Sequence, residues 1–374
     1  MAVRSILRRI AMAVSFLLAA VAGAGLPVLA QGDEPPAPAQ PEAAAAPSPD
    51  AAADAERRST SMVGCNARDP LACFNLAVLL EQGRGGPADP QRAQALYASA
   101  CAREVIEGCF HAGAMLVEGR GGVAIDRERG FRFYQKACDG GHAEGCFFVA
   151  VGHMDRADAA GPGAGLAERA LARAAFMRAC DLGDGPGCFN AGVALSDPGN
   201  GEPDEAAART YYDKGCTLAD TMSCFNLGGL LVKAIGGEAD PVRARAVLTR
   251  GCDLGDGASC SRLAVLLDGG LGGAKDQTGA RRLLEKACGT TFSASCFNLG
   301  VLLIEGRGGP IDRAGAQAAF VKACADNHER ACGEVAGLLG IGPGSPETRA
   351  SLKARLDQAC TGGRAEACTL RSQI

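Results

Sequence analysis

The chain has 374 residues, of which 47% are hydrophobic and only 5% aromatic, with no Trp. It carries 38 Lys and Arg side chains against 42 Asp and Glu, which gives a formal net charge of −4. A mildly acidic chain without a basic stripe is a poor candidate for binding nucleic acid, so we expect no nucleic-acid partner.

The first 30 residues have the pattern of a secretory signal peptide. Arg4, Arg8 and Arg9 form a basic start, and residues 10–18 form a short apolar core. Small residues then lead to a predicted cleavage after Ala30. The apolar part is too short for a spanning helix. We therefore expect a secreted or periplasmic protein with no transmembrane segment in the mature chain.

Residues 31–60 are rich in Pro and Ala and nearly free of large apolar side chains. Such a segment cannot bury enough surface to offset its ordering entropy, so we predict a disordered tether. Residues 61–374 have a globular composition and are expected to form the folded part of the chain.

The 18 cysteines fall into pairs whose two members are separated by seven residues. Successive pairs begin 36 or 37 residues apart, except for one interval of 42. A fixed period of this length is the mark of a stacked solenoid. The sequence therefore predicts about eight complete repeats, which begin at Cys73, Cys109, Cys146, Cys188, Cys224, Cys260, Cys296 and Cys332.

The first half of each unit is predicted to be an amphipathic helix. If the second cysteine of a pair is numbered zero, apolar or small residues stand at +3, +4, +6 and +7, the spacing of a buried helical stripe. Gly83 and Gly306 follow at +10, where a helix C-cap favours a residue with positive φ. In two units the stripe is Leu76, Ala77, Leu79, Leu80 and Leu299, Gly300, Leu302, Leu303.

The second half of each unit has its own helix-start signals. Asp89, Asp240 and Ser345 are each followed by Pro, which is typical of an N-cap before the first helical residue. Each unit is therefore predicted to be a helical hairpin. Small residues at +4, +20 and +27 would let its two helices approach closely, for example Gly300, Ala316 and Ala323.

Each cysteine pair spans the short link between one hairpin and the next. In an exported protein, paired cysteines with no unpaired remainder indicate disulfides. Closing a loop of this size stabilises the fold by about 2.5 kcal/mol in the chain-entropy model. Zinc sites and redox-active pairs are weaker alternatives, because both usually have shorter cysteine spacings. The expected disulfides are Cys65–Cys73, Cys101–Cys109, Cys138–Cys146, Cys180–Cys188, Cys216–Cys224, Cys252–Cys260, Cys288–Cys296, Cys324–Cys332 and Cys360–Cys368, with no metal and no cofactor.

The unit CFNLGVLLIEGRGGPIDRAGAQAAFVKAC, residues 296–324, contains L-G-x-L, G-x-G-G and A-x-x-x-F elements. In these elements it resembles a Sel-1-like repeat. The added cysteine pairs make residues 65–368 similar to the Hcp-type cysteine-rich family of secreted bacterial proteins. The resemblance implies an all-α fold, an α/α solenoid superhelix of disulfide-linked, tetratricopeptide-like hairpins with a concave surface for partners. It also implies a β-lactamase or penicillin-binding activity, and hence a β-lactam or a peptidoglycan-like small ligand.

Position +2 of the first helix lies opposite the apolar stripe at 100° per residue. An amide there can donate to and accept from an extended peptide backbone, so a row of amides suits peptide binding. Alternatively, each Asn caps its own helix or bonds the link between repeats. Phe at +1 is interpreted as packing between repeats. The candidate partner-binding residues are Asn75, His111, Asn190, Asn226 and Asn298.

The sequence assigns no catalytic residue. It lacks S-x-x-K, K-T-G-like and G-x-S-x-G elements, and disulfides would leave no thiolate nucleophile. His111 and His142 lie in neighbouring links and could share a site, although cap or surface roles are favoured. We therefore predict a scaffold that binds a protein or peptide on its concave surface, with a hydrolase as the alternative that the resemblance alone supports.

Three units depart from the regular turn between their helices, at residues 154–168, 196–203 and 340–347. We expect these segments to project as loops from one edge of the solenoid. Length drift in a surface loop explains them more simply than a function does.

Overall fold

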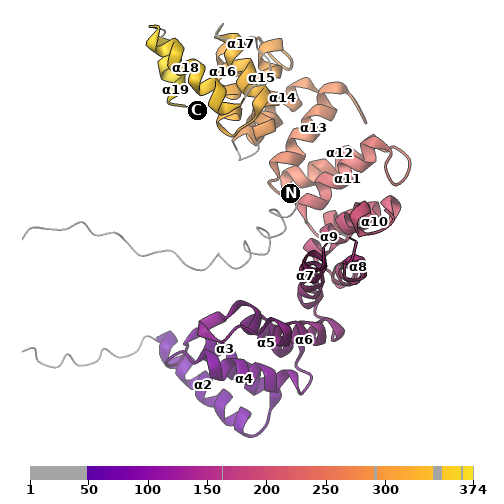
Figure 1. The fold of residues 1–374 in the computed structure, drawn as a ribbon, viewed down its shortest axis with the longest axis vertical. Coiled ribbons are helices and arrows are strands. Elements are labelled where there is room, and N and C mark those ends of the chain that lie inside the picture. Colours follow the sequence, from indigo (N-terminus) through magenta and orange to yellow (C-terminus); the bar gives the residue numbers. More distant parts are fainter. Residues whose placement is uncertain (1–48, 162, 290–292, 340–347, 364, 374) are drawn as a thin grey trace, which may run out of the picture. The chain divides into compact units, whose positions relative to one another are not determined.

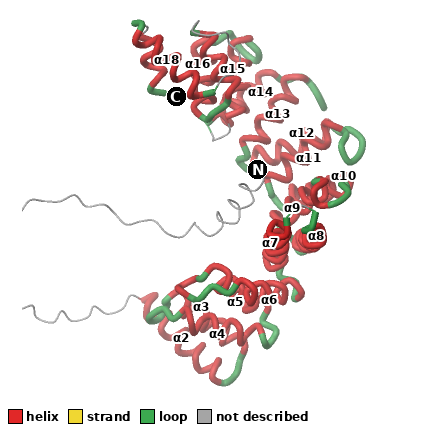
Figure 2. Tube along the Cα trace, in the orientation of Figure 1, coloured by secondary structure: helices red, strands yellow, loops and turns green. Residues whose placement is uncertain are grey.

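The computed structural model describes residues 49–374, apart from 162, 290–292, 340–347, 364 and 374. The predicted signal peptide and the tether up to residue 48 lie outside the described residues. All regular secondary structure in the described part is helical, as Figure 2 shows. The predicted all-α class is confirmed.

The helices form a series of hairpins along the chain (Figure 1). We name the first helix of each unit helix A and the second helix B. Helices A are α3 (Pro70–Gln82), α5 (Ile106–Glu118), α7 (Ala143–Ala160), α9 (Gly185–Ser196), α11 (Thr221–Lys233), α13 (Gly257–Gly269), α15 (Ser293–Glu305), α17 (Glu329–Leu338) and α19 (Ala365–Arg371).

Helices B precede and alternate with helices A. They are α2 (Pro49–Asn66), α4 (Pro90–Cys101), α6 (Arg127–Asp139), α8 (Leu166–Asp181), α10 (Glu205–Thr217), α12 (Pro241–Asp253), α14 (Gln277–Cys288), α16 (Arg313–Ala325) and α18 (Arg349–Thr361). Two 3-10 helices, η1 (Arg120–Gly122) and η2 (Pro198–Asn200), lie in loops. Each α-helix packs against the next one along the chain, which confirms the α/α solenoid.

The predicted apolar stripe is the core of each hairpin. Leu76 and Leu80 of α3 are almost fully buried. Gly300 of α15 faces the ring of Phe320 on α16, and a Cβ at this position would overlap the ring carbons. The small residues at +4 therefore allow helices A and B to approach as predicted.

Aspartate side chains begin the second helices. The Asp89 carboxylate accepts the N–H of Arg92 at 3.0 Å, and the Asp240 carboxylate accepts the N–H of Arg243 at 2.9 Å. Both predicted N-caps are confirmed. The predicted start at Ser345 lies outside the described residues.

Glycines end helix A and shape the turn that follows it. Gly83 and Gly306 have φ of 66° and 70°, so both lie in the left-handed region as predicted. Gly308, also at positive φ, contacts the carbonyl of Gln277 on the preceding helix B, and a side chain there would overlap that oxygen. The loop of one unit therefore packs directly on helix B of the unit before it.

An arginine on helix B holds the loop of the following unit, a contact that we did not predict. Arg245 of α12 donates to four backbone carbonyls of the next unit, at 2.6–3.3 Å: Leu271, Ala274, Leu266 and Gly273. Equivalent arginines donate to one or more loop carbonyls of the next unit; they are Arg58, Arg209 and Arg281. The recurrence of Arg every 36 residues at 209, 245 and 281 was the available signal.

All nine predicted disulfides are present. Each joins the end of a helix B to the start of the following helix A, with the two Cα atoms 4.4–4.7 Å apart. None of the cysteines that the structure describes is free. The cysteines therefore leave no thiolate for a zinc site or a nucleophile.

The first helix begins earlier than we predicted. Residues 49–60, which we expected to belong to the disordered tether, form the first turns of α2. Alanine is the strongest helix former, and residues 51–58 consist of Ala, Asp, Glu and Arg. Low hydrophobicity therefore did not imply disorder here, because contacts with the next unit hold the segment.

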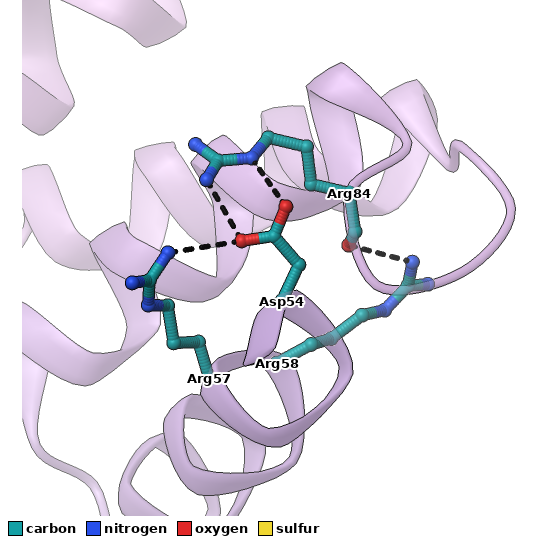
Figure 3. Close-up of polar contacts among 4 residues, drawn as sticks. All are labelled: Asp54, Arg57, Arg58 and Arg84. Carbon is teal, nitrogen blue, oxygen red and sulfur yellow. Dashed lines mark hydrogen bonds and ion pairs between the residues drawn. The ribbon is translucent and has the colours of Figure 1, made fainter. Parts of the chain in front are cut away.

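Figure 3 shows these contacts around Asp54. Its carboxylate accepts two hydrogen bonds from Arg84, at 2.9 and 2.7 Å, and one from Arg57 at 3.1 Å. Arg58 donates to the carbonyl of Arg84 at 3.5 Å. The hydrogen bonds from Arg84 hold the pKa of Asp54 below its ordinary value. Thus α2 docks on the loop after α3 as the other helices B dock on theirs.

Two of the three irregular segments also differ from expectation, and the third, residues 340–347, lies outside the described residues. Because α7 runs to Ala160 and α8 begins at Leu166, most of residues 154–168 is helical, and the prediction of a projecting loop there is wrong. In the second segment, Asn200 is buried; it donates to the carbonyl of Ala194 and accepts from Arg169. Asn200 therefore ties this loop to α8 and α9.

Candidate functional site

The five candidate residues occupy position +2 of helices α3, α5, α9, α11 and α15. We name position +2 of all helices A the +2 row. The other positions of the row are occupied by Phe148, Arg262, Glu334 and Leu370. Of the five candidates, Asn75 is exposed, Asn190 is buried, and His111, Asn226 and Asn298 are half-buried.

Two of the amides are used inside the solenoid. The side chain of Asn190 is 3% exposed, and its Nδ2 donates to the carbonyl of Pro186 at 2.8 Å, one turn earlier in α9. The Nδ2 of Asn298 donates to Oγ of Ser261 on the preceding helix A, at 3.1 Å. The alternative that these Asn residues bond the solenoid itself therefore holds at both positions.

Four side chains of the +2 row contact the residue at +1 of the helix A before them. The guanidinium of Arg262 lies 3.8 Å from the ring centroid of Phe225. The ring centroids of His111 and Phe74 are 5.7 Å apart. Further pairs are Asn298 with Ser261 and Phe148 with Phe110. The +1 and +2 positions therefore join successive helices A.

The aromatic residues at +1 also pack inside their own hairpin. Phe74 lies against Tyr97 of α4 with ring centroids 5.6 Å apart, and Phe297 lies against Phe320 of α16 at 5.7 Å. The interpretation of Phe at +1 as packing between repeats is confirmed, and the same rings bind the two helices of one repeat.

The first units carry a cluster of stacked rings on the +2 row. The imidazole of His111 stacks on Tyr97, with centroids 5.0 Å apart and planes 17° apart. The Tyr97 hydroxyl donates to Glu81 at 2.8 Å. Burial lowers the pKa of His111, so the imidazole is neutral at pH 7. Its Nδ1 has no hydrogen-bond partner among the residues that the structure describes.

Charged side chains next to the row are paired with one another. Nε of Arg120 donates to Glu118 at 2.6 Å, and a terminal guanidinium nitrogen lies 3.8 Å from Glu81 of the preceding helix A. Arg307 repeats this bridge in a later unit, between Glu305 and Asp268. In each of these two bridges one guanidinium lies between two carboxylates, so it offsets part of the negative charge there.

The remaining histidines have local roles. Nδ1 of His142 accepts the N–H of Gly145 at 3.1 Å and caps α7, and His328 caps α17 by accepting from Ala331 at 3.3 Å. His153 is 2.6 Å from Glu168. His142 is therefore used as a helix cap, as we favoured.

Three negative findings apply to residues 49–374 without the gaps given above. No group of three or more His, Cys, Asp or Glu side chains is placed to hold a metal ion. No cysteine is available as a nucleophile. No helix in this part is long and apolar enough to cross a bilayer.

Helical hairpins joined by a disulfide at every link define an α-helical repeat solenoid with cysteine-clipped units. The Sel1 repeat family matches six segments of the chain, which together cover more than half of it: residues 70–104, 106–142, 185–220, 221–256, 257–288 and 293–328. The chain belongs to the Sel1 repeat family.

Solved structures agree with this assignment. The chain is similar to c5321, a protective antigen of uropathogenic Escherichia coli with an SLR fold, at 20% identity and a TM-score of 0.67, over 83% of this chain and 65% of the antigen. It thus spans just under two thirds of that protein. A Sel1 repeat protein from Oxalobacter formigenes matches at 17% identity and a TM-score of 0.60, over 84% of this chain and 89% of that one.

A third similar structure is cysteine rich protein B of Helicobacter pylori, at 22% identity and a TM-score of 0.28, over 37% of this chain and 98% of that one. No curated protein matches the sequence of this chain.

Proposed function

We propose that this protein is an exported scaffold that binds an extended segment of a protein partner along the +2 row. The observation that carries the proposal is a series of contacts along that row: His111, Phe148, Arg262 and Asn298 each reach the +1 residue of the helix A before them. Repeat solenoids use such surfaces, lined by equivalent positions of successive units, to bind extended partners.

The chemistry of the row suits a peptide backbone. Asn75 and Asn226 make no side-chain hydrogen bond with any residue that the structure describes, so each amide has a donor and an acceptor available. Between these two residues stand the rings of His111 and Phe148. The row therefore combines amides for the backbone of a partner with flat surfaces for its side chains. Asn190 is withdrawn from the set because its amide is buried.

Export is supported by the cysteine usage. Nine disulfides with no free cysteine among the described residues are typical of an oxidising compartment. Fractionation of expressing cells, followed by N-terminal sequencing, is expected to find the mature chain outside the cytoplasm and starting at Gln31.

Site-specific photo-crosslinking tests the binding surface. A benzophenone amino acid at Asn75 or Asn226 is expected to form adducts with partner protein in intact cells. The same group at Ser99 or Thr249, exposed residues on helices B, serves as the control. Equal adduct yields from both sets, or adducts from the controls only, would refute the placement on the +2 row.

No observation on the described residues favours the hydrolase alternative, and we do not propose it. Oxidised protein is expected to leave a chromogenic cephalosporin intact. Saturable turnover that is lost on reduction would contradict this expectation.

A further inference from the structure

A surface cavity of about 610 Å³ lies at the links between the first units, away from the residues of the +2 row. Residue 71 and segments 104–107, 140–144 and 183–184 line it, so four successive disulfide-bonded links contribute. We name this cavity the link groove.

One of the links that line the groove lacks a side chain that the next three links have. Two residues after the first cysteine, the next three links carry the exposed residues Leu182, Leu218 and Leu254, whereas this link carries Gly140. The side chain of Ile106 lies over Gly140, so closely that a Cβ there would overlap it. At the neighbouring Gly141, an added Cβ would have no other atom within 4 Å. The floor of the groove is therefore apolar and open to solvent.

The charged side chains that line the groove are all acidic, although Arg103 and Arg178 donate to backbone carbonyls of the same links, those of Arg68 and Asp139. Four carboxylates line the groove, and no Lys or Arg does. The Asp184 carboxylate is used, because it accepts the N–H of Gly187 at 2.6 Å and caps α9. Glu104, Glu107 and Glu144 make no hydrogen bond or ion pair with a residue that the structure describes. Three carboxylates thus surround an apolar floor without a cation of their own.

The groups near the groove do not neutralise it. His142 is fixed as the cap of α7 and stacked on Phe110, and burial lowers its pKa, so it is neutral at pH 7. Partial burial, and then the charge of Asp184, raise the pKa of Glu144, although Arg120 acts against this. Arg120 is itself bridged to Glu118 and Glu81, so its charge is already compensated.

We propose that the link groove is a second docking site, which receives an Arg or Lys side chain from a basic peptide segment of a partner protein. The alkyl stem of that side chain would lie on Ile106 and the glycine backbone, and its cationic head would reach Glu107 and Glu144. Charge complementarity selects this occupant, because an anionic or purely apolar segment would leave the three carboxylates unpaired. The site goes beyond the proposed function of the +2 row and does not require it.

Peptide titration of the full mature protein tests the site. The probe is an acetylated, amidated hexapeptide of alternating Arg and Ala, and a Glu/Ala hexapeptide is its negative control. In amide NMR spectra, the Arg peptide is expected to shift the resonances of Gly140, Gly141 and Gly183 in a saturable way, with an affinity that falls as salt rises. The Glu/Ala peptide is expected to leave them unchanged.

Charge-matched variants separate the groove from the general negative charge of the protein. The double variant Glu107→Gln with Glu144→Gln is expected to bind the Arg peptide with an affinity about tenfold lower, since two exposed ion pairs are lost. Glu202→Gln with Glu238→Gln removes two exposed carboxylates elsewhere and is expected to change the affinity less than twofold by this argument. Unchanged melting curves verify that both variants are folded.

Three results would overturn the proposal. The first is equal weakening by both double variants, which would mean unspecific attraction. The second is a set of shifts that avoids the three glycines. The third is a shift of those glycine resonances on addition of calcium chloride but not of the Arg peptide. That result would mean that the carboxylates bind a metal ion instead. Crosslinking at Asn75 and Asn226 is independent of all three, so failure here and failure of the proposed function can be told apart.

Discussion

The imidazole of His142 lies flat on the ring of Phe110, with the centroids 4.4 Å and the planes 13° apart. The arrangement recurs later in the chain, where His328 lies on Phe297 with centroids 4.6 Å apart. In both cases the histidine caps a helix A through Nδ1 while it covers the +1 phenylalanine of the preceding unit. Proton binding at Nδ1 would remove the acceptor that makes the cap.

Burial lowers the pKa of both histidines, which predicts that acid weakens the fold near neutral pH. Below the unfolded pKa of about 6.5 the unfolded chain binds more protons than the folded one, so the free energy of unfolding falls as pH falls towards the folded pKa. Replacing both residues by Asp, the residue that caps four other helices A, should make the melting temperature change less between pH 7 and pH 5. Thermal melts across this range check it.

The double Asp variant should keep part of the slope, because burial also lowers the pKa of His111. A matched control is His153→Gln, whose side chain contacts Glu168 and caps no helix. An unaltered slope in the double variant would contradict the role assigned to the two caps.

Arg245 makes the most extensive of the contacts between helix B and the next loop. Because Lys cannot reproduce its planar fork, Arg245→Lys should cost about 1–2 kcal/mol of local stability. Arg209→Lys, which removes a single bond to the carbonyl of Glu238, should cost less. Hydrogen exchange of the loop after α13 in Arg245→Lys, and of the loop after α11 in Arg209→Lys, compares the two changes. An equal effect of the two changes would show that the extra bonds contribute nothing.

Two effects favour glycine at position 308, its positive φ and its close approach to a carbonyl. Comparison with Gly255, which has only the first effect, separates them. Gly308→Ala combines a positive φ with overlap on the carbonyl of Gln277, whereas Gly255→Ala has only the positive φ and open space. The conformational cost alone is about 1 kcal/mol. Gly308→Ala should therefore destabilise its unit by at least about 1 kcal/mol more than Gly255→Ala. Denaturation in urea measures both; similar midpoints would mean that the loop yields without cost.

The disulfides should contribute equally by entropy, because all nine close loops of the same length. Replacing Cys216 and Cys224 by Ala should cost about 2.5 kcal/mol. Replacing Cys65 and Cys73 should cost a similar amount but loosen only α2, at the end of the described array. Amide exchange of α10 and α11 distinguishes the two. Alkylation of the unreduced wild-type protein should label no thiol, and labelling would disprove the pairing.

Much of the hairpin fold could be predicted because its signals are local. An Asp N-cap such as Asp89 bonds a residue three positions away, and a C-cap such as Gly83 needs only its own φ. The cysteine spacing then fixes where one hairpin follows the next. The same local reading failed for residues 49–60, whose helix is held by Arg84 from a different unit.

The candidate site could be predicted only in part, since its geometry depends on neighbours about 36 residues away. The helical period indicated a common side of helix A for position +2, but nothing near Asn298 in the sequence reveals that Ser261 accepts its amide. Asn190 and Asn75 look alike in sequence, and the structure separates them, one buried and one exposed. The link groove was missed because it depends on what Gly140 lacks relative to its equivalents.

The fit of Ile106 over Gly140 has a counterpart at the next links, where Leu218 lies beside Gly185. A bulky residue in one link thus meets a small one in a neighbouring link. Excising residues 216–251 would place Leu254 beside Gly185 and preserve this match, whereas excising residues 138–179 would set Leu182 against Ile106. We expect the first deletion variant to give more soluble protein than the second, and the soluble yields of the two measure this. Units of this array are therefore not interchangeable parts: the chain can gain or lose length by duplication or deletion at some links and not at others.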